Sequence, residues 1–584
     1  MIDNGVMNPA EQAAETARLA VYDCIDHRQS FLLEAGAGAG KTESLVRALR
    51  YLIDKQGIKL IQQNQQVACI TFTNAANDIV KSRTDGHPAI IPSTIHAFCW
   101  SLIKGFQPYL QKTLPSLPKW QERLDEAGGI AGREIDYELG YPSAKKDEQK
   151  ISLHHNDVLT LTINLMEQEK FRRLFVARYP ILFIDEYQDT DKNFMNSLKT
   201  HFLENQDNLL IGLFGDDWQK IYGEGCGKVE SNNLIVVKQK ANFRSTRPIV
   251  EMLNLMRPEL PQDVADPKSN GFVAVYHTNK WSGERLTGSH SKGDLPAEYA
   301  HKYLDFLWSH LRENHEWDFF EGKTKILMLT HNVLAKEQGY SGIADIFQGN
   351  SDRFIRKEDA HIKFLVDILE PVCIAYGHKK FGEMFSALGE RTPALNSYAD
   401  KVGWVRDMDK LMELRFSGTI GDVMDHVRKT KRPRVSDSVE EKEVKLQKGL
   451  DGLEPNEQTS LQRLYQLRQI PYQQVIKLAN YIDEKTPFST KHGVKGAQFE
   501  NVLVVCGRGW NLYDFNQFLE WSEGVLPLDK QDNFERNRNL FYVACSRPQK
   551  RLALLFTQEL SDRALETLSK WVGVTNIHSL GDIR

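Results

Sequence analysis

The sequence has little of what would place a protein outside the cell or in a membrane. Its 584 residues include only 7 cysteines, and no two of them form a C-x-x-C pair. This scarcity argues against zinc-ribbon and iron–sulfur ligand patterns and is typical of a reducing compartment. No apolar run approaches the roughly 20 residues of a transmembrane helix, and the first residues lack a basic start followed by an apolar run. We therefore expect an intracellular, cytoplasmic protein with no membrane partner.

An excess of positive charge is also missing. Lys and Arg total 74 and Asp and Glu total 78, so the net charge is −4. A nucleic-acid ligand would therefore need a local groove rather than a general cationic field. The hydrophobic fraction is 41%, and a chain of this length can bury several cores, about three or four domains.

A run of small residues ends in Gly-Lys-Thr between two predicted elements: Ala35, Gly36, Ala37, Gly38, Ala39, Gly40, Lys41, Thr42. The apolar residues 31–33 before it predict a strand, and the periodic apolar residues of 45–53 predict a helix. This context is typical of a P-loop, with Ala35 in the first glycine position. A flexible glycine-rich connector would not need that placement. The run predicts ATP binding, with Lys41 on the terminal phosphates and Thr42 on Mg²⁺.

A second apolar strand, 179–184, ends in Asp185 and Glu186. In P-loop enzymes the first acid of such a pair holds Mg²⁺, and the second orients or deprotonates the attacking water. We therefore predict that Asp185 shares the metal with Thr42 and that Glu186 is the catalytic base. The alternative, a solvated loop start, is common for acidic pairs. The residues that follow, 187–190, weigh against it.

Residues 185–190 resemble motif II of the superfamily 1A DNA helicases, the UvrD/Rep/PcrA group. Other segments resemble further motifs of this family in the family's own order: 71–76 (Ia), 93–98 (Ib), 215–222 (III), 242–246 (IV), 490–499 (V) and 538–547 (VI). Each motif alone is a weak signal. Their order along nearly the whole chain makes the resemblance specific.

The resemblance implies an α/β fold of two RecA-like P-loop lobes, with parallel sheets flanked by helices and a mainly helical insertion in each lobe. The expected parts are lobe 1A at 1–102 and 178–243, insertion 1B at 103–177, lobe 2A at 244–371 and 486–584, and a short insertion 2B at 372–485.

The resemblance also divides the γ-phosphate contacts between the lobes, and it implies these catalytic residues: Lys41, Asp185, Glu186, Gln219, Arg244 and Arg547. Gln219 would join the phosphate to the nucleic-acid side, and the two arginines would stabilise charge in the transition state. Gln12 and Phe243 would contact adenine, and Gln498 would contact the ribose. Gln12 lies further from the P-loop than the family pattern places it, and Phe243 has a core aromatic as its alternative.

Single-stranded DNA is held by stacking and phosphate contacts. By resemblance, the residues that line the strand path are Thr73, Asn74, Thr94, His96, Phe98, Tyr222, Thr490 and His492. For Thr490 and His492 the alternative is an ordinary loop hydrogen bond.

Some segments depart from the family pattern. Ala75 stands where Lys is frequent, residues 223–227 replace a frequent Trp-Arg-Gly, and Gln498 stands where Glu is frequent. These changes concern strand grip and nucleotide contact, so they bear on unwinding more than on ATP hydrolysis. Inside the 2B-like segment, the basic run 428–434 is either a duplex-phosphate contact or a solvated loop.

We expect an ATP-dependent helicase or translocase on single-stranded or tailed DNA, moving 3′→5′ by resemblance, in repair or antiphage defence. A second resemblance, which includes residues 329–335, is to helicase-like subunits of antiphage systems such as Gabija. It implies a DNA- or nucleotide-sensing subunit of a nuclease complex that unwinds weakly alone. A P-loop kinase would leave the later motifs without a purpose.

Overall fold

The computed structural model describes residues 7–130, 132–137, 142–144, 149–205, 208–221, 223, 225–288, 291–319, 323–329, 338–347, 352–355, 357–388, 397–449, 455–482, 488–489, 497–507 and 513–582. These residues form two compact units. The first comprises 1–274, 518–552 and 565–576, and the second comprises 275–517, 553–564 and 577–584.

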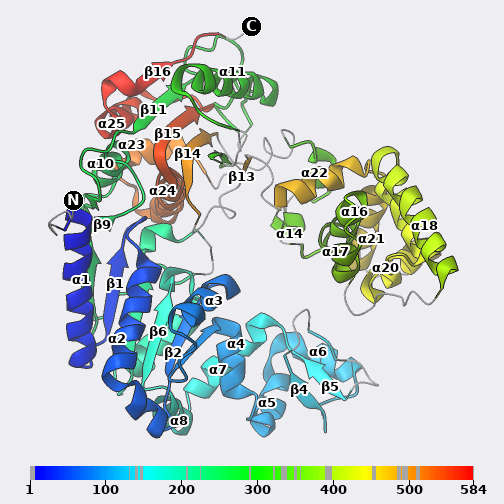
Figure 1. Ribbon diagram of the computed structural model, residues 1–584, viewed down its shortest axis with the longest axis horizontal. Helices are drawn as coiled ribbons and strands as arrows, with labels where there is room; N and C mark the ends of the chain where they lie inside the picture. The colour runs from blue at the N-terminus through cyan, green and yellow to red at the C-terminus, as the bar shows by residue number, and fades with distance from the viewer. Residues whose placement is uncertain are drawn as a thin grey trace. The chain divides into compact units, whose positions relative to one another are not determined.

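The first unit is built on a six-stranded sheet in the order β3-β2-β6-β7-β1-β8 (Figure 1). Its strands are β1 (Phe31–Ala35), β2 (Val67–Thr71), β3 (Ile90–Thr94), β6 (Ile181–Asp185), β7 (Leu210–Gly215) and β8 (Ile235–Gln239). All pairs of neighbours in it run parallel. The carboxyl ends of the strands therefore meet at one edge, which is where ligands bind in such sheets.

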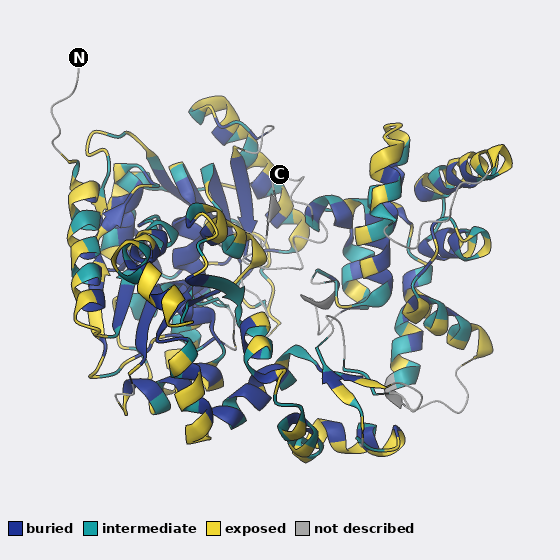
Figure 2. Ribbon diagram, turned by 60° about the horizontal axis from the view of Figure 1, so that its bottom comes forward, coloured by how far each residue is buried: buried dark blue, intermediate teal, exposed yellow. Residues whose placement is uncertain are grey.

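Helices cover both faces of this sheet, so its strands are buried on both sides. Ile181 and Phe183 of β6 belong to one core, which includes residues of α1 and α2. Leu182 and Ile184 belong to the opposite core, with residues of α4, α7 and α9. Figure 2 shows the strands as buried and the outer faces of the helices as exposed. Near-continuous apolar strands are typical of parallel sheets covered in this way.

The helices of this unit follow the strands in the chain. They are α1 (Pro9–Asp26), α2 (Lys41–Gln62), α3 (Asn74–Arg83), α4 (Ile95–Ile103), α5 (Gln107–Thr113), α6 (Pro118–Glu126), α7 (His155–Met166), α8 (Glu169–Arg178), α9 (Lys192–Leu198), α10 (Arg247–Met256) and α24 (Gln531–Cys545). Two short strand pairs complete it: β4 (Glu134–Asp136) with β5 (Lys150–Ser152), and β9 (Ala241–Asn242) with β10 (Asp263–Val264).

A second six-stranded sheet has the order β13-β12-β14-β15-β11-β16. Its strands are β11 (Phe272–His277), β12 (Thr324–Met328), β13 (Phe488–Ser489), β14 (Phe499–Cys506), β15 (Pro548–Phe556) and β16 (Ile577–Ser579). β12 runs parallel to β13 and β14, and β11 runs parallel to β16. Helix α11 (Ala297–His315) follows β11 in the chain, α23 (Phe515–Ser522) follows β14, and α25 (Asp562–Val572) follows β15.

The elements that the structure describes between β12 and β13 are helices, joined by loops and by one isolated bridge between Thr419 and Pro471. These helices are α13 (Ser341–Ile346), α14 (Asp352–Ile355), α15 (Ala360–Phe364), α16 (Glu370–Gly377), α17 (Phe381–Ala387), α18 (Tyr398–Ser417), α19 (Ile420–Thr430), α20 (Asp437–Lys448), α21 (Pro455–Arg468) and α22 (Gln473–Ile482). A π-helical turn, Leu365–Leu369, joins α15 to α16.

Several expectations from the sequence are confirmed. The run 31–33 lies in β1, the strand before Asp185 is β6, and the helix predicted at 45–53 lies in α2, whose bounds are Lys41–Gln62.

The basic run 428–434 begins inside α19 and continues as a loop in which Lys431 and Arg434 are exposed. Arg428 donates two hydrogen bonds to Glu440 at 2.7 and 2.9 Å, so this arginine is paired within its own unit. A contact of the run with duplex phosphates stays a prediction.

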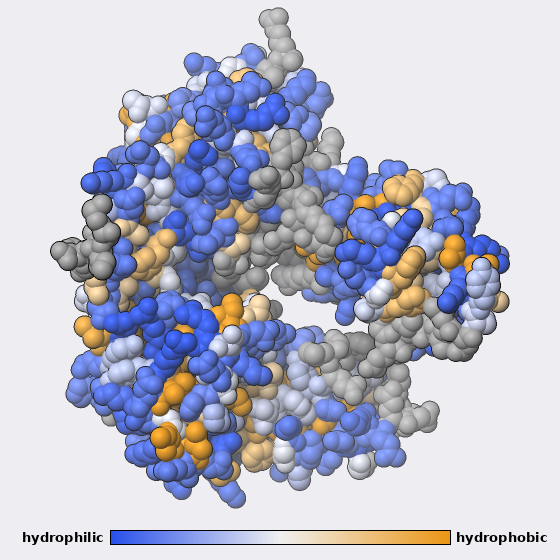
Figure 3. Space-filling view, viewed as in Figure 1, coloured by the Kyte–Doolittle hydropathy of each residue, from blue (hydrophilic) through white to orange (hydrophobic). Residues whose placement is uncertain are grey.

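In the described part of the chain, no helix has both the length and the apolar composition needed to cross a membrane. Figure 3 shows a face on which hydrophilic side chains predominate and hydrophobic ones are scattered.

Candidate nucleotide-binding site

The P-loop turns between β1 and α2 at the carboxyl edge of the first sheet. Gly38 and Gly40 have φ angles of +76° and +81°, a region that side chains rarely adopt. A Cβ on Gly38 would lie 2.8 Å from the side chains of Asn242 and Arg244. Glycine is therefore required at Gly38 both by its backbone angle and by its neighbours.

Residues of the segment 239–262 donate hydrogen bonds to the carbonyl groups of this loop. Ala37 O accepts hydrogen bonds from Asn242 Nδ2 and Gln262 Nε2, both at 3.1 Å. Gly38 O accepts one from the Phe243 amide at 2.9 Å, and Gln239 Nε2 donates to Ala39 O. We call these contacts the carbonyl clamp. Because a helix leaves its first N–H groups without partners inside the helix, the start of α2 offers donors to an anion.

The acidic pair lies next to the P-loop lysine. Glu186 Oε1 is 3.9 Å from Lys41 Nζ, and Asp185 Oδ1 accepts a hydrogen bond from the Glu186 amide at 3.0 Å. Glu186 has a φ of +49°, which costs a non-glycine residue on the order of 1 kcal/mol and is frequent at functional sites. The structure thus brings Lys41, Asp185 and Glu186 together, with Thr42 in the first turn of α2.

Gln188 joins the acidic pair to the loop after β7. Its Nε2 donates to Glu186 Oε2, and its Oε1 accepts from the Asp216 amide at 3.1 Å. A Cβ on Gly215 would lie 2.3 Å from Gln188 Oε1, and one on Gly225 would lie 2.4 Å from Gln188 O. A residue larger than glycine therefore does not fit at Gly215 or at Gly225. In the glycine-rich segment after motif III, this packing accounts for Gly225, whereas a Cβ on Gly223 would meet nothing within 4 Å.

Gln219 lies between a carboxylate and an arginine. Its Nε2 donates to Asp216 Oδ2 at 2.7 Å, and its Oε1 accepts from Arg547 Nη2 at 3.2 Å. Arg244 Nη1 donates to Ser546 O at 2.9 Å, next to Arg547. Gln219 and Arg547 are buried. The structure thus gathers three of the predicted catalytic residues within the first unit.

The electrostatics of the two arginines favour an anion. Burial, followed by the charge of Arg244, lowers the pKa of Arg547 to about 9. Burial also lowers the pKa of Arg244, while Tyr542 and Glu186 act in the opposite direction. Arg244 Nε is buried and has no hydrogen-bond partner within the described residues. A buried cation with an unsatisfied donor is costly. Together with the P-loop, this environment fits a polyphosphate.

Phe243 is exposed beside the P-loop. Its side chain is 46% exposed, and a Cβ on Gly40 would lie 3.9 Å from its ring. The core-aromatic alternative therefore does not apply. Gln12 is exposed on α1, the helix that packs against β8, β9 and β10, and its amide donates to Met7 O at 2.9 Å. Gln498 is exposed just before β14 in the second unit.

The predicted DNA contacts divide into three groups. Thr73 and Asn74 are exposed at the start of α3, and Thr94 and His96 are half-buried at the start of α4. Phe98 is only 1% exposed and packs against Phe175 and Tyr179. Because its ring is part of the core, the expected strand contact at Phe98 is wrong for this structure. Tyr222, Thr490 and His492 lie outside the described residues.

His96 belongs to a cluster of aromatic side chains. Its ring centre is 4.9 Å from that of His155, and the His155 ring is 5.5 Å from that of His154. Burial, followed by the charges of His155 and His154, lowers the pKa of His96 to about 4. His96 is therefore neutral at pH 7. No cluster of three or more metal-ligating side chains occurs in the described parts of the chain.

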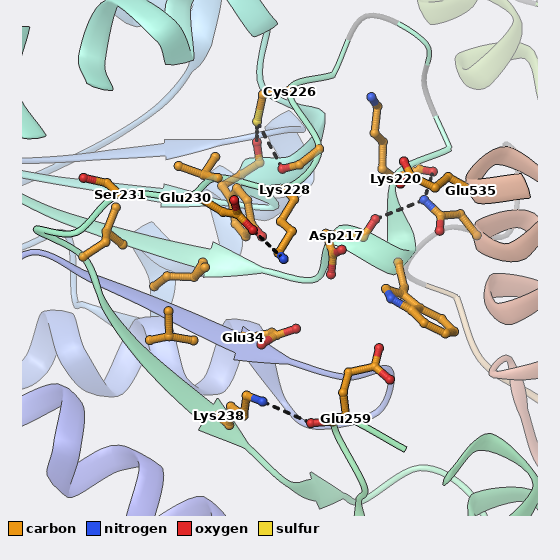
Figure 4. A pocket seen from close by; sticks show the side chains of 18 of the residues that line it. Glu34, Asp217, Lys220, Cys226, Lys228, Glu230, Ser231, Lys238, Glu259 and Glu535 are labelled. Atoms are coloured by element: carbon orange, nitrogen blue, oxygen red, sulfur yellow. Dashed lines mark hydrogen bonds and ion pairs between the residues drawn. The ribbon is translucent and has the colours of Figure 1, made fainter. Parts of the chain in front are cut away.

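A groove of about 920 Å³ lies beside this network (Figure 4). Glu34, Asp217, Lys220, Lys228 and Glu259 are among the residues that line it, so it carries both signs of charge. The Lys228–Glu230 ion pair at 2.6 Å crosses its wall.

Sequence reasoning missed two buried side chains of the site. Gln262 belongs to the carbonyl clamp, and Arg257 contacts Asp216 at 2.5 Å. Neither stands in a recognisable motif. The only signal for Arg257 is that it directly follows a helix with an apolar face, where a cation would otherwise be solvated.

Comparison with known proteins agrees with this geometry. Residues 18–224 match the AAA domain family, and residues 378–559 match the UvrD-like helicase C-terminal domain family. The chain is 23% identical to Gabija protein GajB of Bacillus cereus, over 93% of this chain and 95% of that protein. It is 21% identical to the ATP-dependent DNA helicase Rep of Buchnera aphidicola, over 90% and 91%. It is 24% identical to the ATP-dependent DNA helicase PcrA of Staphylococcus aureus, over 38% and 37%.

The parallel sheets flanked by helices correspond to the two RecA-like lobes that the motif order implied. The family matches, the similarity to GajB and Rep along the chain, and the assembled motifs I, II, III, IV and VI support one conclusion. The chain is similar to the UvrD/Rep/PcrA-like helicases along nearly its whole length.

Proposed function

We propose that this chain hydrolyses ATP and couples the hydrolysis to single-stranded DNA, as a helicase or translocase. The observation that carries the proposal is Gln219, which is hydrogen-bonded both to Asp216 and to the buried Arg547. An amide held between Asp216 and Arg547 can shift when phosphate binds or leaves, and it can pass that shift to its own loop. An ATPase needs such a contact if hydrolysis is to change its binding of DNA.

Each site residue has a role in the proposed reaction. Lys41 and the amides at the start of α2 bind the phosphates of the substrate, and Thr42 and Asp185 would hold Mg²⁺, which supplies charge neutralisation. Glu186 accepts a proton from the attacking water. Arg244 and Arg547 stabilise the charge that develops on the leaving phosphates, a contribution on the order of 10³–10⁵ in rate for one arginine. Phe243 stacks on the base, and Gln12 and Gln498 are proposed nucleotide contacts.

The proposed strand path uses the carboxyl ends of β2 and β3. Thr73 and Asn74 follow β2, and Thr94 and His96 follow β3, so their side chains lie along the sheet edge that carries the P-loop. Tyr222, Thr490 and His492 extend the proposal by resemblance. Movement in the 3′→5′ direction and the lobe boundaries 1–102 with 178–243 and 244–371 with 486–584 are likewise proposals from the family pattern.

The test is steady-state ATP hydrolysis by the purified chain, with and without single-stranded DNA. We expect hydrolysis that DNA stimulates and that Lys41→Ala abolishes. Duplexes with a 3′ or a 5′ tail then test the direction, and only the 3′-tailed substrate should be unwound. Hydrolysis that is indifferent to DNA would contradict the proposal.

A second function is favoured by the similarity to GajB over 93% of the chain. In this case the chain is a DNA- or nucleotide-sensing subunit of an antiviral nuclease complex and unwinds poorly alone. Assays of the chain with and without a nuclease encoded beside it separate the two functions. Strong unwinding of a 3′-tailed duplex by the isolated chain would contradict the second function.

A further inference from the structure

Arg257 follows α10 and is buried among carboxylates. Its side chain is 2% exposed. Its Nη1 lies 2.5 Å from Asp216 Oδ1, and its Nη2 lies 2.7 Å from Glu34 Oε1 and 3.2 Å from Asp217 Oδ1. Its Nε is 3.4 Å from Glu259 Oε1. Figure 4 labels Glu34, Asp217 and Glu259, which come from different segments and gather at the same end of the groove.

Aromatic rings complete the surroundings of Arg257. Its guanidinium carbon is 5.0 Å from the ring centre of Trp218 and 5.8 Å from that of Tyr542. The Tyr542 hydroxyl accepts a hydrogen bond from the P-loop amide of Ala37 at 3.3 Å. Arg257 therefore touches the end of β1, the loop after β7 and helix α24, which carry motifs I, III and VI.

The contact with Asp216 has a direct consequence for Gln219. Asp216 uses Oδ1 for Arg257 and Oδ2 for Gln219 Nε2. A carboxylate held at one oxygen by a charge-assisted hydrogen bond cannot rotate freely. Because the amide nitrogen of Gln219 is bound to Asp216, its oxygen is directed to Arg547.

We propose that Arg257 is a positioning residue for the hydrolysis reaction: by fixing Asp216 it sets the orientation of the Gln219 amide, and through it the contact with Arg547. The role rests on the proposed ATPase function. Arg257 is not a catalytic residue, because the contacts described for it are with protein groups of other motifs. None of them is with a P-loop group that is proposed to bind phosphate.

A purely structural ion cluster is the competing explanation. One arginine faces Glu34, Asp216 and Asp217, which are all largely buried. Burial and the charge of Asp216 raise the pKa of Asp217 to about 6 despite Arg257 and Arg538. The carboxylates thus still repel one another. Because buried ion pairs often add little net stability, a cluster with surplus negative charge is a poor device for stability alone.

The test is steady-state ATP hydrolysis by the full chain with saturating single-stranded DNA. Arg257→Lys keeps the charge but loses the planar fork that reaches several carboxylates. We expect kcat to fall by about 10-fold or more while KM for ATP changes by less than about 3-fold, as for a lost transition-state contact. The stimulation by DNA should fall with it. Gln219→Ala combined with Arg257→Lys should have the kcat of Gln219→Ala alone, because both act through one contact.

Two further variants keep the test decisive. Arg415→Lys changes another buried arginine, which donates two hydrogen bonds to Glu370 in the second unit, and its kcat should equal that of the wild type. If Arg257→Lys fails to fold, Asp216→Asn replaces it, because Arg257 then keeps Glu34 and Asp217 as partners. This variant should also lower kcat without adding to Gln219→Ala.

The outcomes separate the two proposals. Wild-type kcat and DNA stimulation in Arg257→Lys, or additive effects of Arg257→Lys and Gln219→Ala, would overturn the positioning role alone. A wild-type chain whose hydrolysis ignores DNA would overturn the proposed function and this role with it.

Discussion

Arginine side chains are buried in both units, but their partners differ. In the second unit Arg415 donates two hydrogen bonds to Glu370, at 2.6 and 2.8 Å. Burial lowers the pKa of Arg415, but Glu370 outweighs it, so the pKa is raised. In the first unit burial outweighs nearby negative charge at Arg244 and Arg547, whose pKa values are lowered, whereas at Arg257 the carboxylates outweigh burial and the pKa is raised.

The difference distinguishes two kinds of buried cation. At Arg257 and Arg415, protein carboxylates offset the cost of burying the guanidinium charge. Arg244, whose charge is opposed by burial and whose Nε lacks a partner within the described residues, fits the proposed contact with phosphate.

The largest expected effect comes from Arg244→Gln. We expect kcat for ATP hydrolysis to fall by about 10³-fold or more, because a charge-stabilising arginine is lost. The melting temperature should stay the same or rise, since an incompletely satisfied buried charge has been removed. Hydrolysis assays and thermal unfolding of the same preparation check both. A large loss of stability would place Arg244 with the structural arginines.

Arg415→Gln should have the opposite profile. It leaves Glu370 buried without its cation, so the free energy of unfolding of the second unit should fall by about 3–5 kcal/mol. The kcat of folded molecules should not change. Urea denaturation followed by circular dichroism measures the first, and Arg434→Gln, in an exposed pair with Asp437, is the control with an expected change below about 1 kcal/mol. Equal losses in both variants would contradict the distinction.

Gln262→Leu tests the carbonyl clamp with a smaller effect. It removes one of the two donors to Ala37 O, which keeps Asn242 Nδ2, and it removes the Gln262 donor to Ala241 O; a buried carbonyl that loses its partner costs about 1–3 kcal/mol. We expect ATP binding to weaken by about 10-fold, because the loop shape is less well held. Titration with a fluorescent ATP analogue measures the change. Gln65→Leu, which removes a surface contact with Ala177 O, should bind ATP as the wild type does.

The smallest effect concerns a neutral buried group. The folded pKa of His96 is about 4, below its ordinary value of 6.5. Its imidazole therefore binds a proton more tightly in the unfolded chain than in the folded one. Its contribution to stability is complete above pH 6.5 and is lost as the pH falls towards 4. The slope is at most about 1.4 kcal/mol per pH unit and smaller for a half-exposed ring. Thermal unfolding at pH 7.5 and 5.5 should show a smaller difference for His96→Gln than for the wild type.

The parts of the site that lie on consecutive residues could be predicted from the sequence. The P-loop, Asp185 with Glu186, and the strands that carry them follow from apolar runs that end in small or acidic residues. These signals are local, because the backbone of one turn and the strand before it bring the groups together. The meeting of the two segments, with Lys41 Nζ 3.9 Å from Glu186 Oε1, was implied only by the resemblance to the family, because β7 lies between β1 and β6 in the sheet.

The parts that depend on packing between distant segments could not be predicted. Arg257 and Gln262 are single polar residues in ordinary surroundings, and a lone arginine is more often a surface cation. Only the fold shows that Arg257 meets Glu34, more than two hundred residues earlier in the chain. Phe98 is the converse case: its motif predicts a strand contact, but its neighbours Phe175 and Tyr179 make it part of the core.

The glycines around Gln188 have a mechanical consequence. Gly215 and Gly225 leave no free volume on either side of this residue, and protein interiors compress very little. A displacement of Glu186 by a few tenths of an ångström cannot be absorbed there and must shift the end of β7. The stiffness of this contact, and not the strength of any single hydrogen bond, then sets how faithfully a change at the acidic pair reaches Gln219.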